Sequence, residues 1–528
     1  MSWPGVALLN SADMNAVDLT LFASRIEAVC EEMGARLQCA AFSPNIKDRL
    51  DFSCAVFDAG GELCAQAAHI PVHLGSMAYA MRDIVREVEW HRGDMVVLND
   101  PYFGGTHLPD VTLIAPLFLD EQLLAFVVNR AHHADIGADS PGSMPISHSL
   151  QEEGLIIPPS KLLRGGAIDE AMFTHIISHL QHEQQARGDF AAQISANQAG
   201  LTRLQSLVTA LGREAFAQGL LELNDYAERL ARTALRDIPD GEYRFEDVMD
   251  DDGLGHFDLP IVATITVSGD DIEVDFSGTA AQTPGNINCP LSVAAAGVYY
   301  VFRCLMPAHT PACAGTFRSI RFSAPEGCLL NAKRPAAVAA GNVETSTRVV
   351  DVVMGALAQA IPQRIPAASH GSMNNVAMGA RGAHSWDYYE TLGGGMGAGA
   401  EGGGLSAVQT HMTNTLNTPI EVLEMHYPLR INRYAVRDNS GGAGKRRGGD
   451  GLVREYEFLA PASVTLLTER RRHSAWGVAG GRAGQAGENR YNGKPVAGKV
   501  SLQVEAGDRL CISTPGGGGW GEEVSRKC

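Results

Sequence analysis

The chain has 528 residues, of which 45% are hydrophobic and 19% charged, a composition typical of a globular protein with two or three domains. The net charge of −18 argues against a nucleic-acid-binding surface. There is no signal-peptide pattern and no apolar run of about 18 residues, so we expect a cytoplasmic protein that does not span a membrane. The ten cysteines form no CxxC pair, which favours buried thiols over a zinc ribbon.

The N-terminal part predicts helices that alternate with hairpins. Residues 16–36 and 76–88 carry apolar side chains at helical spacing, and residues 95–98 form a short apolar strand. Between the two helices, FSCAVFD (52–58), a Gly-Gly turn and ELCAQAA (62–68) predict a hairpin.

The register of this first hairpin predicts two contacts between carboxylates and imidazoles. Folding about the Gly-Gly turn sets Asp51 near His69 and Asp48 near His73, because residues equidistant from a hairpin turn lie opposite each other.

A second, longer hairpin organises the centre of this region. Two apolar runs, Val111–Leu119 and Leu123–Asn129, flank a polar break at residues 120–122. Folding about this break places Val111 opposite Arg130 or Ala131. The polar segments at the two open ends of the hairpin are thereby brought together.

These open ends carry the candidate reactive centre. His107, Asp110 and His132 converge there, and imidazole and carboxylate groups are the usual ligands of a Zn- or Mn-type divalent ion. Two interpretations stay open from the residues alone: hydrogen bonding at strand ends, or a metal site with a fourth ligand from the turn at Asp48. His133 and Asp135 are candidates to support the ligands from outside.

The next segment is helical. Residues 169–236 predict three or four helices. His175, His179 and His182 have a spacing that places them on one helical face, which could bind a metal, although a solvated face is the favoured interpretation.

Beyond residue 240 the sequence alternates as strands do. Ile261–Val267 and Ile272–Phe276 predict a hairpin about a Gly-Asp turn. Residues 338–360 predict a helix whose start near Thr345 can present N–H groups to an anion. Residues from Val453 onward predict a β-rich end.

The expected fold class is therefore α+β and multi-domain, with mixed and antiparallel sheets, a helical insert and a β-rich C-terminal part. The expected divisions are an N-terminal α+β domain with the metal site, a helical segment, a central α+β domain with Gly-rich loops, and a β-rich part, at residues 1–165, 166–238, 239–452 and 453–528.

Glycine-rich and basic segments do not predict a nucleotide site. Gly393–Gly404 follows no clear strand, and in Gly442–Arg446 the lysine precedes Arg instead of Ser or Thr. We expect these glycines and those of Pro515–Gly521 to allow close backbone packing or to form a substrate-covering loop. Arg470–His473 could bind an anion, although a solvated edge is the simpler interpretation.

Long motifs spread over nearly the whole chain resemble the hydantoinase B/oxoprolinase family. They are SPNIKDRLDFSCAVFD (43–58), HIPVHLGSM (69–77), GDMVVLNDPYFGGTHLPD (93–110), NRAHHADIG (129–137), EEGLIIPPSKL (152–162), DFSGTAAQTPGNINCP (275–290), AAGNVETSTRVVDV (339–352), YYETLGGGMGA (388–398) and STPGGGGWG (513–521).

The resemblance implies one component of a two-component enzyme that acts on a small cyclic amide. A hydantoinase A/oxoprolinase-type partner with an actin-like ATP fold binds the ATP, and the complex is a hetero-oligomer such as α2β2. The family's metal positions map onto His107, Asp110 and His132, and the fourth onto Asp48. Many relatives carry Glu at that fourth position, so Asp51 is the alternative.

The mechanism implied is hydrolysis of an activated ring. The partner phosphorylates the amide carbonyl oxygen, and this chain delivers water with the help of a divalent metal, with His133 or Asp135 relaying the proton. Two other functions stay open: a subunit of an acetone-type carboxylase, and a non-catalytic scaffold for the A-type subunit.

Overall fold

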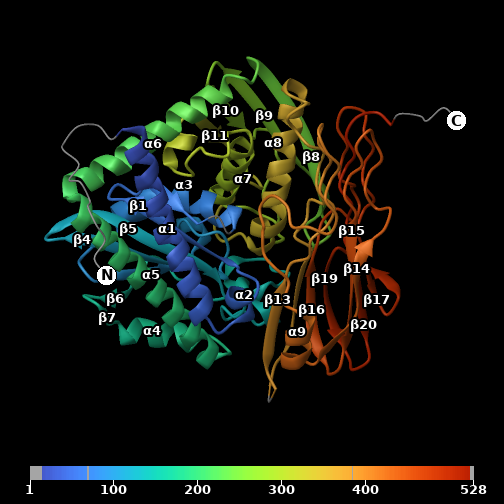
Figure 1. Ribbon diagram of the computed structural model, residues 1–528. Helices are drawn as coiled ribbons and strands as arrows, with labels where there is room; N and C mark the ends of the chain where they lie inside the picture. Colours follow the sequence, from blue (N-terminus) through green and yellow to red (C-terminus); the bar gives the residue numbers. More distant parts are fainter. Residues whose placement is uncertain (1–14, 68–69, 383, 524–528) are drawn as a thin grey trace.

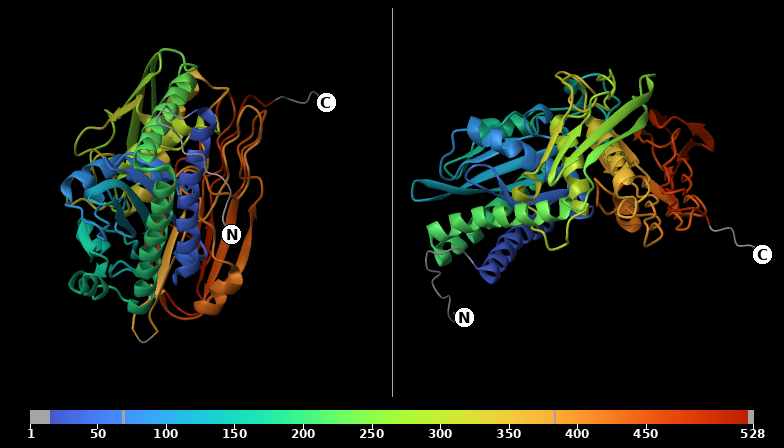
Figure 2. Two further views of the ribbon diagram at one scale, coloured as in Figure 1. Left: turned by 60° about the vertical axis from the view of Figure 1, so that its left-hand side comes forward. Right: turned by 90° about the horizontal axis from the view of Figure 1, so that it is seen from above.

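The computed structural model describes residues 15–67, 70–382 and 384–523 as a multi-domain α+β protein (Figure 1). In Figure 2 the N-terminal sheet and the C-terminal strands lie at opposite ends of the molecule, with β8–β11 and the helices α7 and α8 between them. The predicted fold class is confirmed.

The N-terminal sheet has seven strands in the order β2-β1-β5-β4-β3-β6-β7. Their bounds are β1 (Phe52–Asp58), β2 (Leu63–Gln66), β3 (Met95–Leu98), β4 (Asp110–Leu119), β5 (Gln122–His132), β6 (Ser160–Arg164) and β7 (Ala167–Ile168). Both predicted hairpins are confirmed, and the longer one pairs Val111 with Ala131 and Asp110 with His132. The predicted contact of Asp51 with His69 lies outside the described residues.

Helices cover both faces of this sheet. α1 (Ala16–Ala40) and α5 (Glu183–Leu211) share a core with residues such as Val127 of β5, whereas α3 (Pro71–Glu87) packs with Val128. Because successive strand residues point to opposite faces, the continuous apolar runs of β4 and β5 serve two cores at once. The remaining helices of this part are α2 (Pro44–Lys47), α4 (Glu170–Ile177) and α6 (Arg213–Leu235).

The central sheet has the order β11-β10-β9-β8, and its core includes two long helices. The elements are β8 (Gly241–Asp251), β9 (Phe257–Ser268), β10 (Asp271–Asp275), β11 (Ile320–Ser323), α7 (Leu291–Cys304) and α8 (Ser346–Ala360). The predicted β9–β10 hairpin is confirmed. α8 begins at Ser346, next to the predicted Thr345, but the Ser346 N–H is not available to an anion. A π-helical turn, Gly341–Thr345, runs into α8, and this N–H donates to the carbonyl oxygen of Gly341.

Two further sheets face each other across an apolar core in the C-terminal part, in the orders β13-β12-β16-β19 and β14-β15-β20-β17-β18. The expected division between residues 452 and 453 falls inside β15, which pairs with strands on both sides. The elements are β12 (Asn375–Ala380), β13 (Trp386–Glu390), α9 (Ile420–His426), β14 (Leu429–Arg437), β15 (Gly451–Phe458), β16 (Ala462–Leu467), β17 (Glu488–Tyr491), β18 (Lys494–Val496), β19 (Lys499–Val504) and β20 (Arg509–Ser513).

The Gly-rich loops pack backbone against backbone. Gly517 donates to Gly449 and accepts from Gly442, with N···O distances of 3.0 and 2.8 Å. A Cβ atom on Gly517 would lie 2.2 Å from the carbonyl oxygen of Met396, a distance no side chain tolerates. Of the two roles expected for these glycines, the structure therefore shows close backbone packing at Gly517.

None of the helices in the described ranges combines the length and apolar character that crossing a membrane requires.

Candidate metal centre

The three predicted ligands meet at the open end of the β4–β5 hairpin. Asp110 is the first residue of β4, His132 is the last of β5, and His107 lies just before β4. Asp110 Oδ1 lies 3.1 Å from His107 Nε2 and 3.3 Å from His132 Nδ1. All three side chains are buried, and their ligand atoms lie within 4.8 Å of one another.

A third imidazole joins the cluster. His73 Nε2 lies 3.1 Å from Asp110 Oδ2, and its Nδ1 lies 3.4 Å from Ser53 Oγ. The hairpin register predicts His73 near Asp48, and this prediction is wrong. Instead the chain turns into α3 at Pro71, and the first turn of this helix directs His73 to Asp110. A proline at a helix start is the sequence signal for that turn.

The structure brings Asp51, and not Asp48, to the cluster. A cavity of about 20 Å³, the size of one water molecule or ion, is lined by Asp51 and by the four residues just described. Asp51 is also tied to the hairpin, because its carbonyl accepts from the His132 N–H at 3.0 Å.

Asp48 lies half-buried at the end of α2, among a different set of residues. Burial raises the pKa of the Tyr427 hydroxyl, and the charges of Asp387 and Asp48 raise it further. The carboxylate of Asp48 therefore acts on Tyr427, away from the cavity.

Several polar atoms of the cluster have no hydrogen-bond partner in the described part of the chain. They are His107 Nε2, His132 Nε2 and Asp110 Oδ1. His107 Nε2 and Asp110 Oδ1 lie within contact distance but are not aligned as donor and acceptor. Leaving buried polar atoms unpaired is costly, so this donor set fits a divalent cation that accepts their lone pairs.

The charges of the cluster are mutually dependent. Burial raises the pKa of Asp110, but His107 and His73 lower it more, so it lies well below its usual range. Burial lowers the pKa of His107, but Asp110 reverses this and the pKa is raised overall. Burial lowers the pKa of His132. Asp110 is thus an anion at neutral pH, as a metal ligand must be.

Surrounding groups fix the orientation of these side chains. The His107 Nδ1 lies 3.3 Å from the carbonyl oxygen of Ala339, which leaves Nε2 free for a ligand. Glu153, which is buried, accepts the N–H groups of Val338 and Ala339, each at 2.9 Å. Glu153 belongs to the EEGLIIPPSKL motif, and residue spacing alone does not indicate this role.

Tyr389 covers the other side of the centre. Its ring stacks on that of His132, and its hydroxyl donates to Asn375 at 2.7 Å. On Asp110, Oδ2 accepts from the hydroxyl of Thr106 at 2.5 Å and lies 3.3 Å from the amide of Asn342.

His133 and Asp135 lie outside the cluster. His133 Nε2 contacts Gln193 at 3.0 Å, and the Asp135 carboxylate accepts the backbone N–H groups of Gln181 and His182. Neither side chain lines the small cavity. The chain leaves β5 after His132 and turns these two residues toward α5, where they make structural contacts.

Of the three histidines expected to share a helical face, His175 and His179 lie together, with ring centroids 4.7 Å apart, but His182 does not join them. His175 lies on α4, and His179 and His182 follow it in the turn before α5. His182 pairs with Asp387 at 2.6 Å. His175 and His179 are exposed, in agreement with the favoured solvated interpretation.

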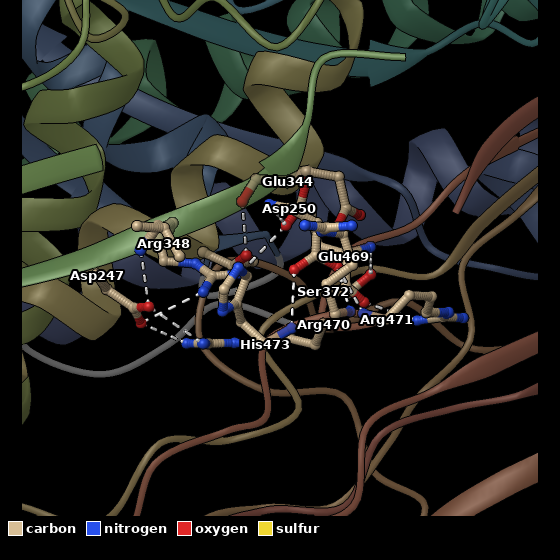
Figure 3. A network of polar contacts seen from close by, with 12 residues as sticks. Asp247, Asp250, Glu344, Arg348, Ser372, Glu469, Arg470, Arg471 and His473 are labelled. Carbon is tan, nitrogen blue, oxygen red and sulfur yellow. Dashed lines mark hydrogen bonds and ion pairs between the residues drawn. The ribbon is translucent and has the colours of Figure 1, made fainter. Parts of the chain in front are cut away.

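The basic run at residues 470–473 takes part in a network of polar contacts (Figure 3) and is divided between the interior and the surface. Arg470 is buried and binds Asp247 at 2.7 Å and Asp351 at 2.5 Å. The solvated-edge interpretation is therefore wrong for Arg470, but it holds for Arg472 and His473, which are partly exposed and pair with Asp258.

Fold and site together define a multi-domain α+β protein with a buried His/Asp cluster suited to a divalent cation. The chain belongs to the Hydantoinase B/oxoprolinase family, whose model matches residues 15–523. The predicted family resemblance is confirmed.

Three relatives illustrate the family. The chain is 38% identical to 5-oxoprolinase 1 of Arabidopsis thaliana, in a match that covers 98% of this chain and 42% of that longer protein. It is 32% identical to the B component of a putative D-/L-hydantoinase of a Pseudomonas species, covering 95% of this chain and 89% of that one. The solved ATP-dependent caprolactamase of Pseudomonas jessenii superimposes with a TM-score of 0.90 at 28% identity, covering 97% of this chain and 92% of the other.

Proposed function

We propose that this chain is the B-type subunit of an ATP-dependent cyclic-amide hydrolase. The observation that carries the proposal is the buried cluster of His107, Asp110 and His132, in which one polar atom of each side chain has no hydrogen-bond partner among the described residues. The names of the relatives, D-/L-hydantoinase, 5-oxoprolinase and caprolactamase, support ring amides as the substrate class.

The proposed metal site consists of His107, Asp110 and His132, with Asp51 as the fourth ligand. Zinc or manganese fits a set of imidazole and carboxylate donors. When bound, the ion would lower the pKa of a coordinated water and stabilise developing negative charge.

Residues of this chain would prepare that site. The carbonyl of Ala339 selects the His107 tautomer, and Tyr389 holds the plane of the His132 ring. The negative charge of Asp110 stabilises positive charge on the nearby imidazoles. The site is buried away from bulk water, where electrostatic interactions are strong.

The proposal assigns ATP to a partner. A hydantoinase A-type subunit would phosphorylate the amide carbonyl oxygen, because resonance makes an unactivated lactam a poor electrophile. The net reaction consumes two water molecules. One cleaves the C–N bond of the phosphorylated ring and leaves an acyl phosphate, and the other releases this phosphate, so that ATP becomes ADP and phosphate. The sequence of this chain has no phosphate-binding loop of the Walker type, which is consistent with that division.

The test is His107→Ala in the complex reconstituted with the A-type partner, with metal content and ring opening both measured. We expect both to be lost. His175→Ala, which alters an exposed histidine, is the matched control. Retention of metal and turnover in His107→Ala would refute the site.

Two further outcomes would replace the proposal. Bicarbonate-dependent turnover with incorporation of labelled carbon would identify a carboxylase subunit. A native complex that contains no metal and does not need this chain for turnover would identify a scaffold.

A further inference from the structure

A larger cavity lies beside the metal centre. Its volume is about 540 Å³, within the roughly 300–1,000 Å³ typical of small-molecule sites. Thr413, a buried residue, lines both this cavity and the small one at the metal centre. Pro71 lines the larger cavity and its neighbour Val72 lines the smaller, so the two spaces adjoin at the start of α3.

The walls of the larger cavity suit a flat polar ring. Tyr299 and Phe317 stack on each other with centroids 4.4 Å apart, and Tyr300 packs edge-on against His411. Amide and hydroxyl side chains make up much of the remaining wall. Burial lowers the pKa of His411, so this imidazole is neutral at pH 7.

One permanent charge faces this cavity. Among the described residues that line it, Arg303 is the single arginine, and no lysine, aspartate or glutamate is present. This is unusual in a chain whose net charge is −18. No described carboxylate forms an ion pair with Arg303, and burial lowers its pKa.

The guanidinium of Arg303 is held in place by the backbone. It donates to the carbonyl groups of Pro307, Ala308 and Thr310, at 3.3, 3.5 and 2.7 Å. A guanidinium has about five N–H donors, so roughly two remain. A fixed cation with unused donors and no acidic partner is a binding group for an anion.

We propose that this cavity is the substrate chamber of the hydrolase and that Arg303 selects a cyclic amide that carries an anionic group. This inference rests on the proposed function. The anion has two possible sources with the same chemistry: a carboxylate on the ring itself, or the phosphate that the partner adds to the carbonyl oxygen. Either would pair with Arg303 while the ring packs against the aromatic wall.

The experiment compares 5-oxoproline with 2-pyrrolidinone, which is the same ring without the carboxylate, as substrates of the reconstituted complex. If the carboxylate is the anion, wild type prefers 5-oxoproline in kcat/KM by about tenfold or more, and Arg303→Met abolishes the preference. If the phosphate is the anion, Arg303→Met lowers kcat/KM for both substrates by about the same factor.

The matched control is Arg364→Met. Arg364 also donates to a backbone carbonyl beyond the end of α7, that of Leu305 at 2.6 Å, but it does not line the cavity. We expect wild-type kinetics from this variant, and Arg303→Lys should keep part of the effect because it retains the charge. An Arg303→Met variant that is folded and loaded with metal, yet has unchanged kinetics on both substrates, overturns the inference.

A binding experiment distinguishes failure of the proposed function from failure of the anion site at Arg303. If the wild-type complex opens neither ring, the hydrolase assignment fails, and the cavity is tested by titrating 5-oxoproline and inorganic phosphate into the metal-loaded chain. At least one should bind wild type about tenfold more tightly than Arg303→Met. Equal affinities for both proteins reject Arg303 as an anion site.

Discussion

The ring of Tyr389 lies flat on the ring of His132, with centroids 4.6 Å apart and 11° between their planes. Tyr389 belongs to β13, in the C-terminal half, whereas His132 ends β5 of the N-terminal sheet. The Tyr389 hydroxyl donates to Asn375, whose amide donates to the buried Glu344 at 2.7 Å. The candidate metal centre is thus supported by a part of the chain remote in sequence from the proposed ligands.

Replacing Tyr389 should weaken metal binding through loss of stacking. Tyr389→Ala frees the His132 ring to rotate, and supporting groups of this kind are worth roughly 10- to 100-fold in metal affinity. Tyr389→Phe keeps the stacked ring and loses one hydrogen bond, so we expect a smaller effect. Metal titration by competition with a chelator measures both variants. Equal affinity of Tyr389→Ala and wild type would contradict the supporting role.

Glu153 should control the centre through the backbone. Its carboxylate accepts a hydrogen bond from the N–H of Ala339, and the carbonyl oxygen of Ala339 lies 3.3 Å from His107 Nδ1. Glu153→Ala removes both acceptor contacts and should lower metal affinity about tenfold or more. Glu153→Gln keeps one amide oxygen as acceptor and should retain most of the affinity. Competition with a chelator measures the metal affinity of both variants. If Glu153→Gln loses as much metal affinity as Glu153→Ala, the negative charge of Glu153 matters, and its hydrogen bonds to the backbone do not suffice.

Some of the site could be predicted from the sequence because hairpin geometry is local. A short polar turn between two apolar runs is enough to bring the ends of β4 and β5 together, but it left Val111 opposite either Arg130 or Ala131. The structure pairs Asp110 with His132, with a shift of register between Leu117 and Phe118. The prediction that Asp48 lies near His73 also used hairpin register, and it was wrong. The chain leaves the hairpin geometry at both places, because α2 ends at Lys47 and α3 begins at Pro71.

The supporting residues could not be predicted in that way. Ala339, Asn342 and Tyr389 reach the centre from elements more than two hundred residues beyond the hairpin. Their positions depend on how the central and C-terminal sheets pack on the first one. Likewise Arg470 looked like a surface residue because its partners, Asp247 and Asp351, are distant in sequence.

The choice of fourth ligand can be decided by a pair of substitutions. Asp51 lines the small cavity at the candidate metal centre and Asp48 does not. We therefore expect Asp51→Asn to lose metal and ring-opening activity, and Asp48→Asn to retain both. Elemental analysis of the two purified proteins is the measurement. The opposite pattern would return the assignment to Asp48.

Close packing of the Gly-rich loops should make Gly517 intolerant of any side chain. The Cβ of alanine would lie 2.2 Å from the Met396 oxygen, and a backbone atom in a packed bundle cannot move aside. We expect Gly517→Ala to lower the free energy of unfolding by about 3 kcal/mol, the upper end for overpacking. Gly399→Ala is the control, because nothing lies within 4 Å of its added Cβ. Urea unfolding of both variants tests the difference.

The buried pair of Asp247 and Arg470 should make stability depend on acid. Asp247 contacts Arg348 and Arg470 (Figure 3). Burial raises the pKa of Asp247, but the two arginines lower it more, so in the folded protein this pKa lies below its ordinary value. A carboxyl group whose pKa is lowered by folding stabilises the folded protein. This contribution is complete above the pKa of the group in the unfolded chain, about 4, and it is lost as the pH falls toward the pKa in the folded protein.

Asp247→Asn removes this contribution, so the stability of the variant should fall less steeply than that of wild type between about pH 5 and pH 3. At pH 7 the variant should be less stable by about 3–5 kcal/mol, because Arg470 loses one of its two buried partners. Asp258→Asn, in the exposed pair with Arg472, is the control and should leave both quantities nearly unchanged. Urea titrations at pH 3, 4, 5 and 7 give the measurement, and parallel acid profiles of Asp247→Asn and wild type would exclude Asp247 as the source.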